Sequence, residues 1–308
     1  MPIFRLESDE LIIAQETDLE LETHLETWLE NSPQALAQEF FLWIGRQPSA
    51  ADEEGVIFPD LLGVDSEGNL IIVELKRERA PRDVMAQLLE YAVWASELSE
   101  AQIHQIAETY FATRDEFKGK VFHDTFRDKF DIPEIDELPV LNRGLRLFIV
   151  AEEVPTRVAR VCRFLRTSHG MDITCIDVST FQTEAGEKLI SMETKVGDED
   201  VITSKAQKQS NSQTSRWSGD KPIKQVVWEG VEDFIDGDVG IEFTIAEVKK
   251  VILKKYPDFK PRNVGAEIAA DCVNHSSRHH YPGGIDRYWQ IERGRYRLYD
   301  PEKDKIEE

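Results

Sequence analysis

Apolar and polar positions along the first two thirds of the chain change several times between helical and strand-like spacing. Residues 18–30 place leucines and a tryptophan three and four positions apart, which predicts an amphipathic helix that ends at Asn31-Ser32-Pro33. The same helical spacing returns at residues 83–98 and at about 156–168. Short apolar runs predict strands, and these runs lie at 39–47, 56–65, 69–76, 146–151 and 171–178. This alternation predicts an α/β fold with a mixed central sheet flanked by helices.

A polar stretch divides the chain into two predicted domains. Residues 197–221 are rich in Ser and Gln with almost no apolar content, so we interpret them as a flexible linker. The preceding domain, residues 1–196, includes a mostly helical insertion at about 99–142. The following domain, residues 222–308, contains two helical segments and then a pair of strands, which is the order of a small winged-helix-like module.

The two apolar runs on either side of Ser66-Glu67-Gly68 predict a tight β-hairpin, and this hairpin carries the most informative set of candidate site residues. Side chains alternate faces along a strand, so Glu74 and Lys76 point the same way. The turn places Asp60 almost opposite Leu75, so the carboxylates of Asp60 and Glu74 can converge on one cation. Such oxygen ligands suit Mg²⁺ or Mn²⁺, which would lower the pKa of a bound water and polarise a phosphoryl oxygen. Lys76 is placed to orient that water or to stabilise developing charge.

The neighbouring helices contribute further candidates. Gln87 and Tyr91 are four residues apart and share a helical face, so both reach the hairpin if that helix packs across it. A tyrosine at this spacing is also typical of a packed core. Glu22, on the polar side of the first helix, is a candidate metal ligand, with simple solvation of a helix surface as the alternative.

The sequence around Glu74 is a more specific sign of a catalytic site than the three-residue motif Glu74-Leu75-Lys76 itself. An acidic residue two positions before a lysine occurs five times in this chain, as its composition alone would produce. The copy at Glu74 differs from the others because it ends an apolar strand, follows a hairpin opened by Pro59-Asp60, and precedes a helix with a QxxxY spacing.

With this ordered set, the sequence resembles the PD-(D/E)XK nuclease superfamily, and more narrowly the NucS-like endonucleases and the related QxxxY branch. The resemblance covers roughly residues 18–98, and residues 146–178 fit the remainder of that core. It implies a restriction-endonuclease-like fold and hydrolysis of phosphodiester bonds. The C-terminal segment resembles, more loosely, small accessory domains of restriction- and defence-type enzymes.

The resemblance also implies roles for individual residues. Asp60 and Glu74 would be metal ligands, Lys76 the catalytic lysine, and Glu22 the acidic residue of the first helix. Gln87 and Tyr91 would belong to the catalytic helix motif, and Gly45-Arg46-Gln47 to the motif that closes the first strand. The acidic loop after Gln47 and the insertion at 99–142 depart from the family pattern, which puts the mode of substrate binding in doubt.

The negative net charge of the chain limits how it can bind nucleic acid. The formal net charge is −22, and residues 1–60 carry 2 basic and 14 acidic side chains, so bulk positive charge cannot hold a phosphate backbone. Local basic groups remain, because arginines recur every three residues from Arg157 to Arg166, which predicts a basic stripe on one helix face. Salt bridges within the protein and solvated surfaces are the alternatives. The residues expected to contact nucleic acid are Arg46, Gln47, Arg157, Arg160, Lys254 and Lys255.

These patterns predict an Mg²⁺- or Mn²⁺-dependent endonuclease that acts on DNA rather than RNA. Three scattered cysteines without a CxxC pair, and no apolar segment of membrane-spanning length, indicate a cytoplasmic protein with no membrane partner. A composition of 41% hydrophobic and 31% charged residues is that of a folded globular chain. The alternatives are a catalytically silent nuclease-fold binding module and a phage-defence nuclease gated by a partner. A homodimer and a protein partner both stay open.

Overall fold

A computed structural model of the chain describes residues 2–19, 21–37, 39–48, 59–197, 221–281 and 283–305, and the backbone of 50–51 and 56–57. Most of the predicted linker, residues 198–220, lies outside this described part, as does the acidic loop at 52–55. None of the described helices is long and apolar enough to cross a membrane.

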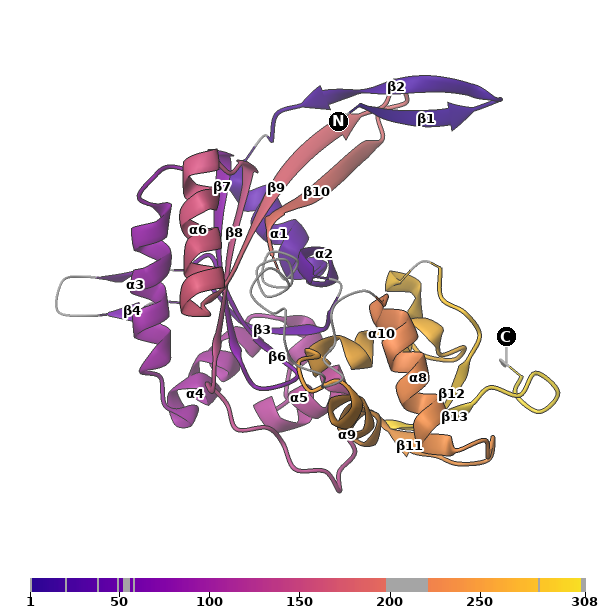
Figure 1. Cartoon of the computed structure of the whole chain (residues 1–308). Coiled ribbons are helices and arrows are strands. Elements are labelled where there is room, and N and C mark those ends of the chain that lie inside the picture. Colours follow the sequence, from indigo (N-terminus) through magenta and orange to yellow (C-terminus); the bar gives the residue numbers. More distant parts are fainter. Residues whose placement is uncertain are drawn as a thin grey trace, which may run out of the picture.

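An eight-stranded mixed sheet occupies the centre of the N-terminal part (Figure 1). The strand order is β1-β2-β9-β8-β7-β6-β3, and β10 pairs with β9. The β7–β8 and β8–β9 pairs are parallel, and the other pairs are antiparallel. The bounds are β1 (Ile3–Glu7), β2 (Glu10–Thr17), β3 (Phe41–Arg46), β6 (Leu61–Asp65), β7 (Leu70–Arg79), β8 (Leu145–Glu153), β9 (Asp172–Gln182) and β10 (Lys188–Val196).

Helices cover both faces of this sheet. In Figure 1, α3 and α6 lie on one side of the parallel strands and α1 lies on the other. Their bounds, with those of their neighbours, are α1 (Glu22–Asn31), α2 (Gln34–Ala37), α3 (Val84–Ser96), α4 (Glu100–Phe111), α5 (Phe122–Phe130) and α6 (Thr156–His169). The predicted α/β architecture with a mixed central sheet flanked by helices is therefore confirmed.

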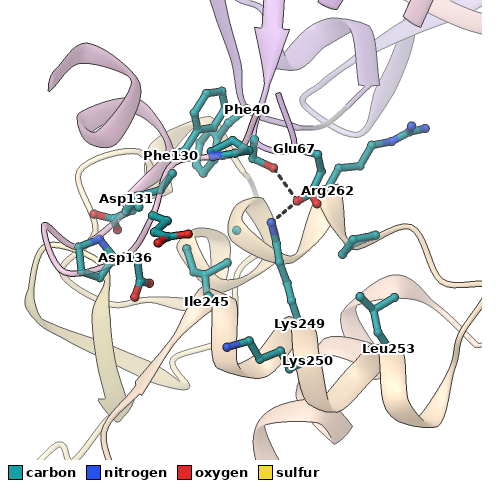
Figure 2. Close-up of a pocket in the computed structure, with 18 residues that line it drawn as sticks. Phe40, Glu67, Phe130, Asp131, Asp136, Ile245, Lys249, Lys250, Leu253 and Arg262 are labelled. Carbon is teal, nitrogen blue, oxygen red and sulfur yellow. Dashed lines mark hydrogen bonds and ion pairs between the residues drawn. The ribbon is translucent and has the colours of Figure 1, made fainter. Parts of the chain in front are cut away.

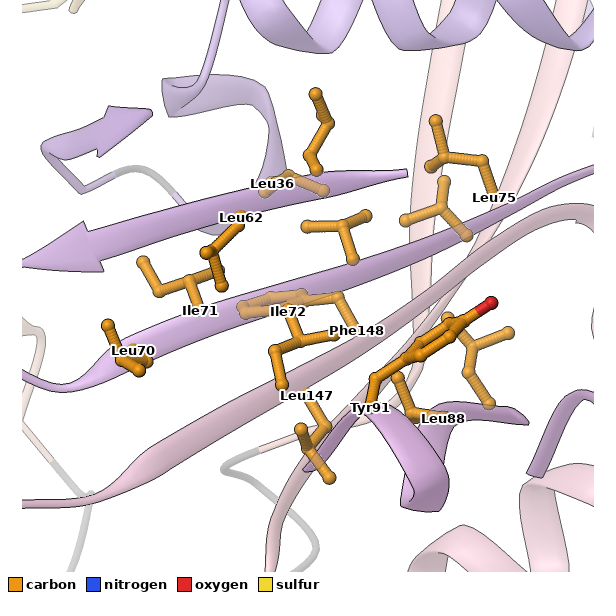
Figure 3. Packing of buried hydrophobic residues seen from close by; sticks show 14 of the residues in the cluster. Leu36, Leu62, Leu70, Ile71, Ile72, Leu75, Leu88, Tyr91, Leu147 and Phe148 are labelled. Carbon is orange, nitrogen blue, oxygen red and sulfur yellow. The ribbon is translucent and has the colours of Figure 1, made fainter. Parts of the chain in front are cut away.

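The central strands are apolar because both of their faces are covered. Residues 70–75 of β7 are all buried, and so are residues 146–151 of β8. Figure 3 shows part of this core, in which apolar residues of β6, β7 and β8 gather with Leu88 and Tyr91 of α3. A strand buried on both sides is a near-continuous hydrophobic run, which is why the sequence located these strands accurately.

Two parts of the N-terminal fold differ from the sequence-based expectation. The predicted strand at 56–65 is two pieces, since β5 (Val56–Ile57) pairs with β4 (Ala50–Ala51) and β6 begins only at Leu61. The hairpin β1–β2 was not predicted at all. Its large apolar side chains are exposed, among them Phe4 and Leu11, so its pattern lacks the buried face on which strand recognition depends.

The C-terminal part has a hydrophobic cluster of its own. Helix α8 packs against α9, and a three-stranded sheet with the order β11-β13-β12 completes the unit. The bounds are α8 (Ile223–Ile235), β11 (Phe243–Thr244), α9 (Ile245–Lys255), α10 (Val264–Asp271), β12 (Tyr288–Glu292) and β13 (Arg295–Leu298). Helix α8 was missed by the sequence-based interpretation.

The C-terminal unit contacts the end of the sheet where β7, β8 and β9 begin. Arg262 forms ion pairs with Glu39 at 3.0 Å and with Asp172 at 2.9 Å. Lys249 on α9 pairs with Glu67 in the β6–β7 turn, beside a cavity of about 500 Å³ between the two units (Figure 2). Glu67 lies seven residues before Glu74, at most about 23 Å away at the usual rise per strand residue.

The helical insertion supplies a second contact with the C-terminal unit. Asp131, directly after α5, accepts a hydrogen bond from Gln290 Nε2 at 2.7 Å and one from the backbone N–H of Gly294 at 3.1 Å. Gly294 has a φ of +70°, and a Cβ there would lie 2.3 Å from the Asp131 carbonyl oxygen. Glycine is therefore required at this contact for both its backbone conformation and its lack of a side chain.

Candidate active site

Asp60 and Glu74 lie opposite each other at the start of β6 and near the middle of β7. Leu61 pairs with Val73, which places Asp60 one step further, opposite Glu74 and within one residue of the predicted register. The Asp60 carboxylate accepts a hydrogen bond from the Leu75 N–H at 2.7 Å. Lys76 lies two residues beyond Glu74 on the same face and donates to it at 2.5 Å. The structure therefore brings the three predicted central residues together.

Burial gives these carboxyl groups unusual electrostatics. Asp60 is 8% exposed and Glu74 is 2% exposed. Burial, followed by the negative charge of Glu74, raises the pKa of Asp60 to about 8. Burial likewise raises the pKa of Glu74, against the opposing effect of Lys76. Two buried acids side by side are costly when both are ionised, and a cation between them removes that cost.

One oxygen of this pair lacks an N–H donor in the described part of the chain. Glu74 Oε2 is buried, and the Asp60 carboxyl beside it can donate to Glu74 only while Asp60 is protonated. Once Asp60 is ionised, this buried carboxylate oxygen has no donor, which costs free energy that a bound cation removes. Carboxylate oxygens are the ligands that hard divalent cations such as Mg²⁺ prefer, and Asp60 and Glu74 are the residues that would bind such a cation.

Helix α1 supplies two more carboxylates to the same place. Carboxylate oxygens of Glu22, Glu26 and Asp60 lie within 4.8 Å of one another. Glu22 also accepts a hydrogen bond from the Arg77 N–H at 2.8 Å, which ties α1 to β7. Glu22 was predicted and Glu26 was not. The available signal was the spacing of four residues between them, which puts both on one helical face.

Arg46 and Gln47 hold α1 in position. Arg46 forms ion pairs with Glu26 at 2.9 Å and with Glu30 at 3.0 Å, and Gln47 Nε2 donates to Glu26 at 3.3 Å. Their contacts in the structure are thus with the acids of α1. Their assignment to nucleic-acid binding stays a prediction.

Helix α3 places Tyr91 near the carboxylates of Asp60 and Glu74. The Tyr91 ring lies in the hydrophobic core, and its hydroxyl points out of the cluster on the side of Leu75 (Figure 3). Burial, followed by the negative charges of Glu74 and Asp60, raises the pKa of Tyr91 to about 12. Gln87 Oε1 is buried without a hydrogen-bond partner among the described residues. Tyr91 is therefore a core residue, and the roles of Tyr91 and Gln87 in the site stay predictions.

The predicted arginine stripe on α6 is wrong. Arg157 and Arg160 are exposed, whereas Arg163 is half-buried and Arg166 is 3% exposed in an ion pair with Asp172. The physical reason is the helical period, because a step of three residues falls about 60° short of a full turn. The three steps from Arg157 to Arg166 therefore add up to about half a turn, which places Arg166 on the opposite face of α6.

Basic groups do gather where β7 and β8 end. Arg79, Arg82 and Arg157 line a cavity of about 600 Å³ there, and all three are exposed. Arg79 and Arg82 were not predicted, because neither belongs to a regular spacing. In the C-terminal unit, Lys254 is exposed and Lys255 pairs with Asp233 at 2.7 Å. The structure does not bring these two lysines to the carboxylates.

The raised pKa of Asp60 predicts a pH-dependent stability of the metal-free protein. Because the folded pKa is about 8 against an ordinary value of 3.8, folded Asp60 keeps its proton where the unfolded chain has lost it. The free energy of unfolding should therefore fall as pH rises from about 4 to about 8. Urea denaturation across this range, with Asp60→Asn as the comparison, measures the effect. An identical pH profile for the Asp60→Asn protein would contradict it.

Comparisons with known proteins give matches to parts of this chain. The sequence model of a family described as a domain of unknown function, DUF7669, matches residues 222–298. No curated protein matches the chain. Similar solved structures include an EndoMS–dsDNA2 complex, with 20% identity and a TM-score of 0.28 over 52% of this chain and 47% of that one. A repair endonuclease from Pyrococcus abyssi is similar at 18% identity and a TM-score of 0.28, over 53% and 50%. The chain spans about half the length of these structures.

Proposed function

We propose that this protein is a metal-dependent nuclease that hydrolyses phosphodiester bonds in DNA. The observation that carries the proposal is the buried pair Asp60 and Glu74, with Lys76 on the same face of β7 as Glu74 and a Glu74 oxygen that lacks an N–H donor among the described residues. A solvated surface salt bridge would not place two acids at 8% and 2% exposure beside each other.

Each residue of the site has a role in this reaction. Asp60 and Glu74 would hold Mg²⁺ or Mn²⁺, and Glu22 and Glu26 are close enough to complete the acidic side of the site. The bound ion supplies Lewis-acid activation of the phosphoryl group and a more acidic water. The Lys76 ammonium is positioned to orient the attacking water and to offset charge on the phosphorane oxygens. Gln87 and Tyr91 shape the wall of the site beside α3.

The distribution of charge supports DNA contact away from the acidic N-terminal residues. Arg79 and Arg82 follow Glu74 along the chain, and Arg157 lies beside them at the start of α6. Guanidinium groups recognise phosphates through paired hydrogen bonds. We place the phosphate backbone along these three arginines. We also assign residues 222–298 to the winged-helix class, because their order of helix, strand, helix, helix, strand and strand is that of such modules.

A cleavage assay tests this proposal. Single-stranded, double-stranded and branched DNA, and RNA, are incubated with the full chain in Mg²⁺, in Mn²⁺ and in EDTA. Cleavage of DNA with either metal and none in EDTA is the expected result. Metal-independent cleavage would overturn the assignment of Asp60 and Glu74. No cleavage of any substrate, together with DNA binding, would favour the catalytically silent module.

A further inference from the structure

The helical insertion carries a second cluster of ligand-type side chains, separate from the acids around Asp60. Glu100 and His104 lie one turn apart on α4, and His123 lies on α5. One ligand atom from each of the three lies within 4.8 Å of the other two. His104 Nε2 and Glu100 Oε1 are 3.9 Å apart, and the imidazole rings of His104 and His123 have their centroids at 4.7 Å.

His104 is the central member of this cluster. Its Nε2 atom is buried and has no hydrogen-bond partner among the described residues. The ring is held against Phe122, with a centroid separation of 4.7 Å, so its orientation is fixed by packing. A buried imidazole nitrogen without a partner costs free energy unless a ligand occupies its lone pair.

We propose that Glu100, His104 and His123 form a binding site for a transition-metal cation of the Zn²⁺ class. Two imidazoles and one carboxylate are a ligand set that zinc accepts, with the fourth position left to water. The preference for imidazole nitrogen separates this site from the all-oxygen site at Asp60, which suits Mg²⁺.

The distances are within reach of metal coordination. Ligand atoms at about 2.0–2.1 Å from a tetrahedral ion are about 3.4 Å from each other. The 3.9 Å separation of His104 and Glu100 needs a small closing movement. Glu100 and His123 are exposed, so their side chains can rotate toward the ion while His104 stays in place. The ion would join α4 to α5 and so fix the helix that ends at the Asp131 contact with the C-terminal unit.

Zinc binding tests this site independently of nuclease activity. The full chain with Glu74→Gln, which weakens the candidate active site, is titrated with Zn²⁺ against a chromogenic chelator in excess Mg²⁺. Binding of one Zn²⁺ per chain is the expected result. Adding His123→Asn should weaken that binding more than about tenfold, because even the loss of an outer-shell partner of a metal ligand costs this much. His123 is exposed, so this variant leaves the core intact.

Two further variants make the result decisive. His104→Asn should weaken Zn²⁺ binding as His123→Asn does, whereas His169→Asn, which removes an exposed histidine at the end of α6, should leave it unchanged. The proposal is overturned if the protein binds no Zn²⁺ in excess Mg²⁺, or if His123→Asn binds it as tightly as the parent.

Discussion

We expect Glu74→Gln to lower the rate of the proposed DNA cleavage by at least about a hundredfold, and Lys76→Met to have an effect of the same order. Removing a single preorganised group that stabilises transition-state charge typically costs a factor of about 10²–10³ in kcat. Glu74→Gln keeps the shape of the side chain and removes the charge that would hold the cation, while Lys76→Met keeps the aliphatic stem and removes the ammonium. Single-turnover cleavage at saturating Mn²⁺ measures both effects.

The control for these variants is Glu97→Gln. Glu97 is exposed at the end of α3, so its replacement makes the same change in charge away from the site. We expect this variant to cleave DNA at the parent rate. Circular dichroism and thermal unfolding establish that the two site variants are folded. Cleavage at the parent rate by folded Lys76→Met protein would remove Lys76 from the mechanism.

We expect Arg146→Met to lower the free energy of unfolding by about 3–5 kcal/mol, the usual consequence of removing one partner from a buried ion pair. Arg146 is 3% exposed and donates to Glu39 at 2.8 and 2.9 Å and to Asp65 at 3.2 Å. Without the Arg146 guanidinium, the carboxylates of Glu39 and Asp65 stay buried with less positive charge to balance them. The same network includes Asp172 and Arg262, so the variant also weakens the contact with the C-terminal unit. Urea denaturation at constant pH measures the loss.

Arg143→Met is the matched control, since Arg143 is exposed three residues earlier in the chain. It should change the free energy of unfolding by no more than about 0.5 kcal/mol. Adding Glu39→Gln to Arg146→Met should recover part of the lost stability, because the paired charge is then removed as well. Equal losses for Arg143→Met and Arg146→Met would contradict a structural role for the network.

The sequence was sufficient to predict those strands and residue positions that depend on interactions between neighbours in the chain. Continuous apolar runs located β7 and β8 because strands buried on both faces have no other pattern. The hairpin turn then fixed the register of Asp60 against Glu74 to within one residue, since strand pairing propagates from the turn. The assignment of Lys76 to the face of Glu74 followed from strand alternation alone.

The sequence was insufficient where a side chain's partner lies far away in the chain. The spacing of four residues puts Glu26 on the helical face of Glu22, but nothing local indicates that Arg46 pairs with it. Arg166 was grouped with exposed arginines, although Asp172 pairs with it inside the fold. The hairpin β1–β2 lacks a buried face, and Asp131 is one of many acids until the β12–β13 turn packs on it. Charge pairing of this kind depends on tertiary contacts that periodicity does not encode.

The most direct test of the central claim is an anomalous-diffraction map of a crystal of the protein soaked in Mn²⁺. We predict a peak between Asp60 and Glu74, within about 2.5 Å of an oxygen from each and close to Glu74 Oε2, which lacks an N–H donor among the described residues. Soaking the Asp60→Asn protein in the same way should abolish this peak. A map of the parent protein with no Mn²⁺ between these two carboxylates would contradict the account.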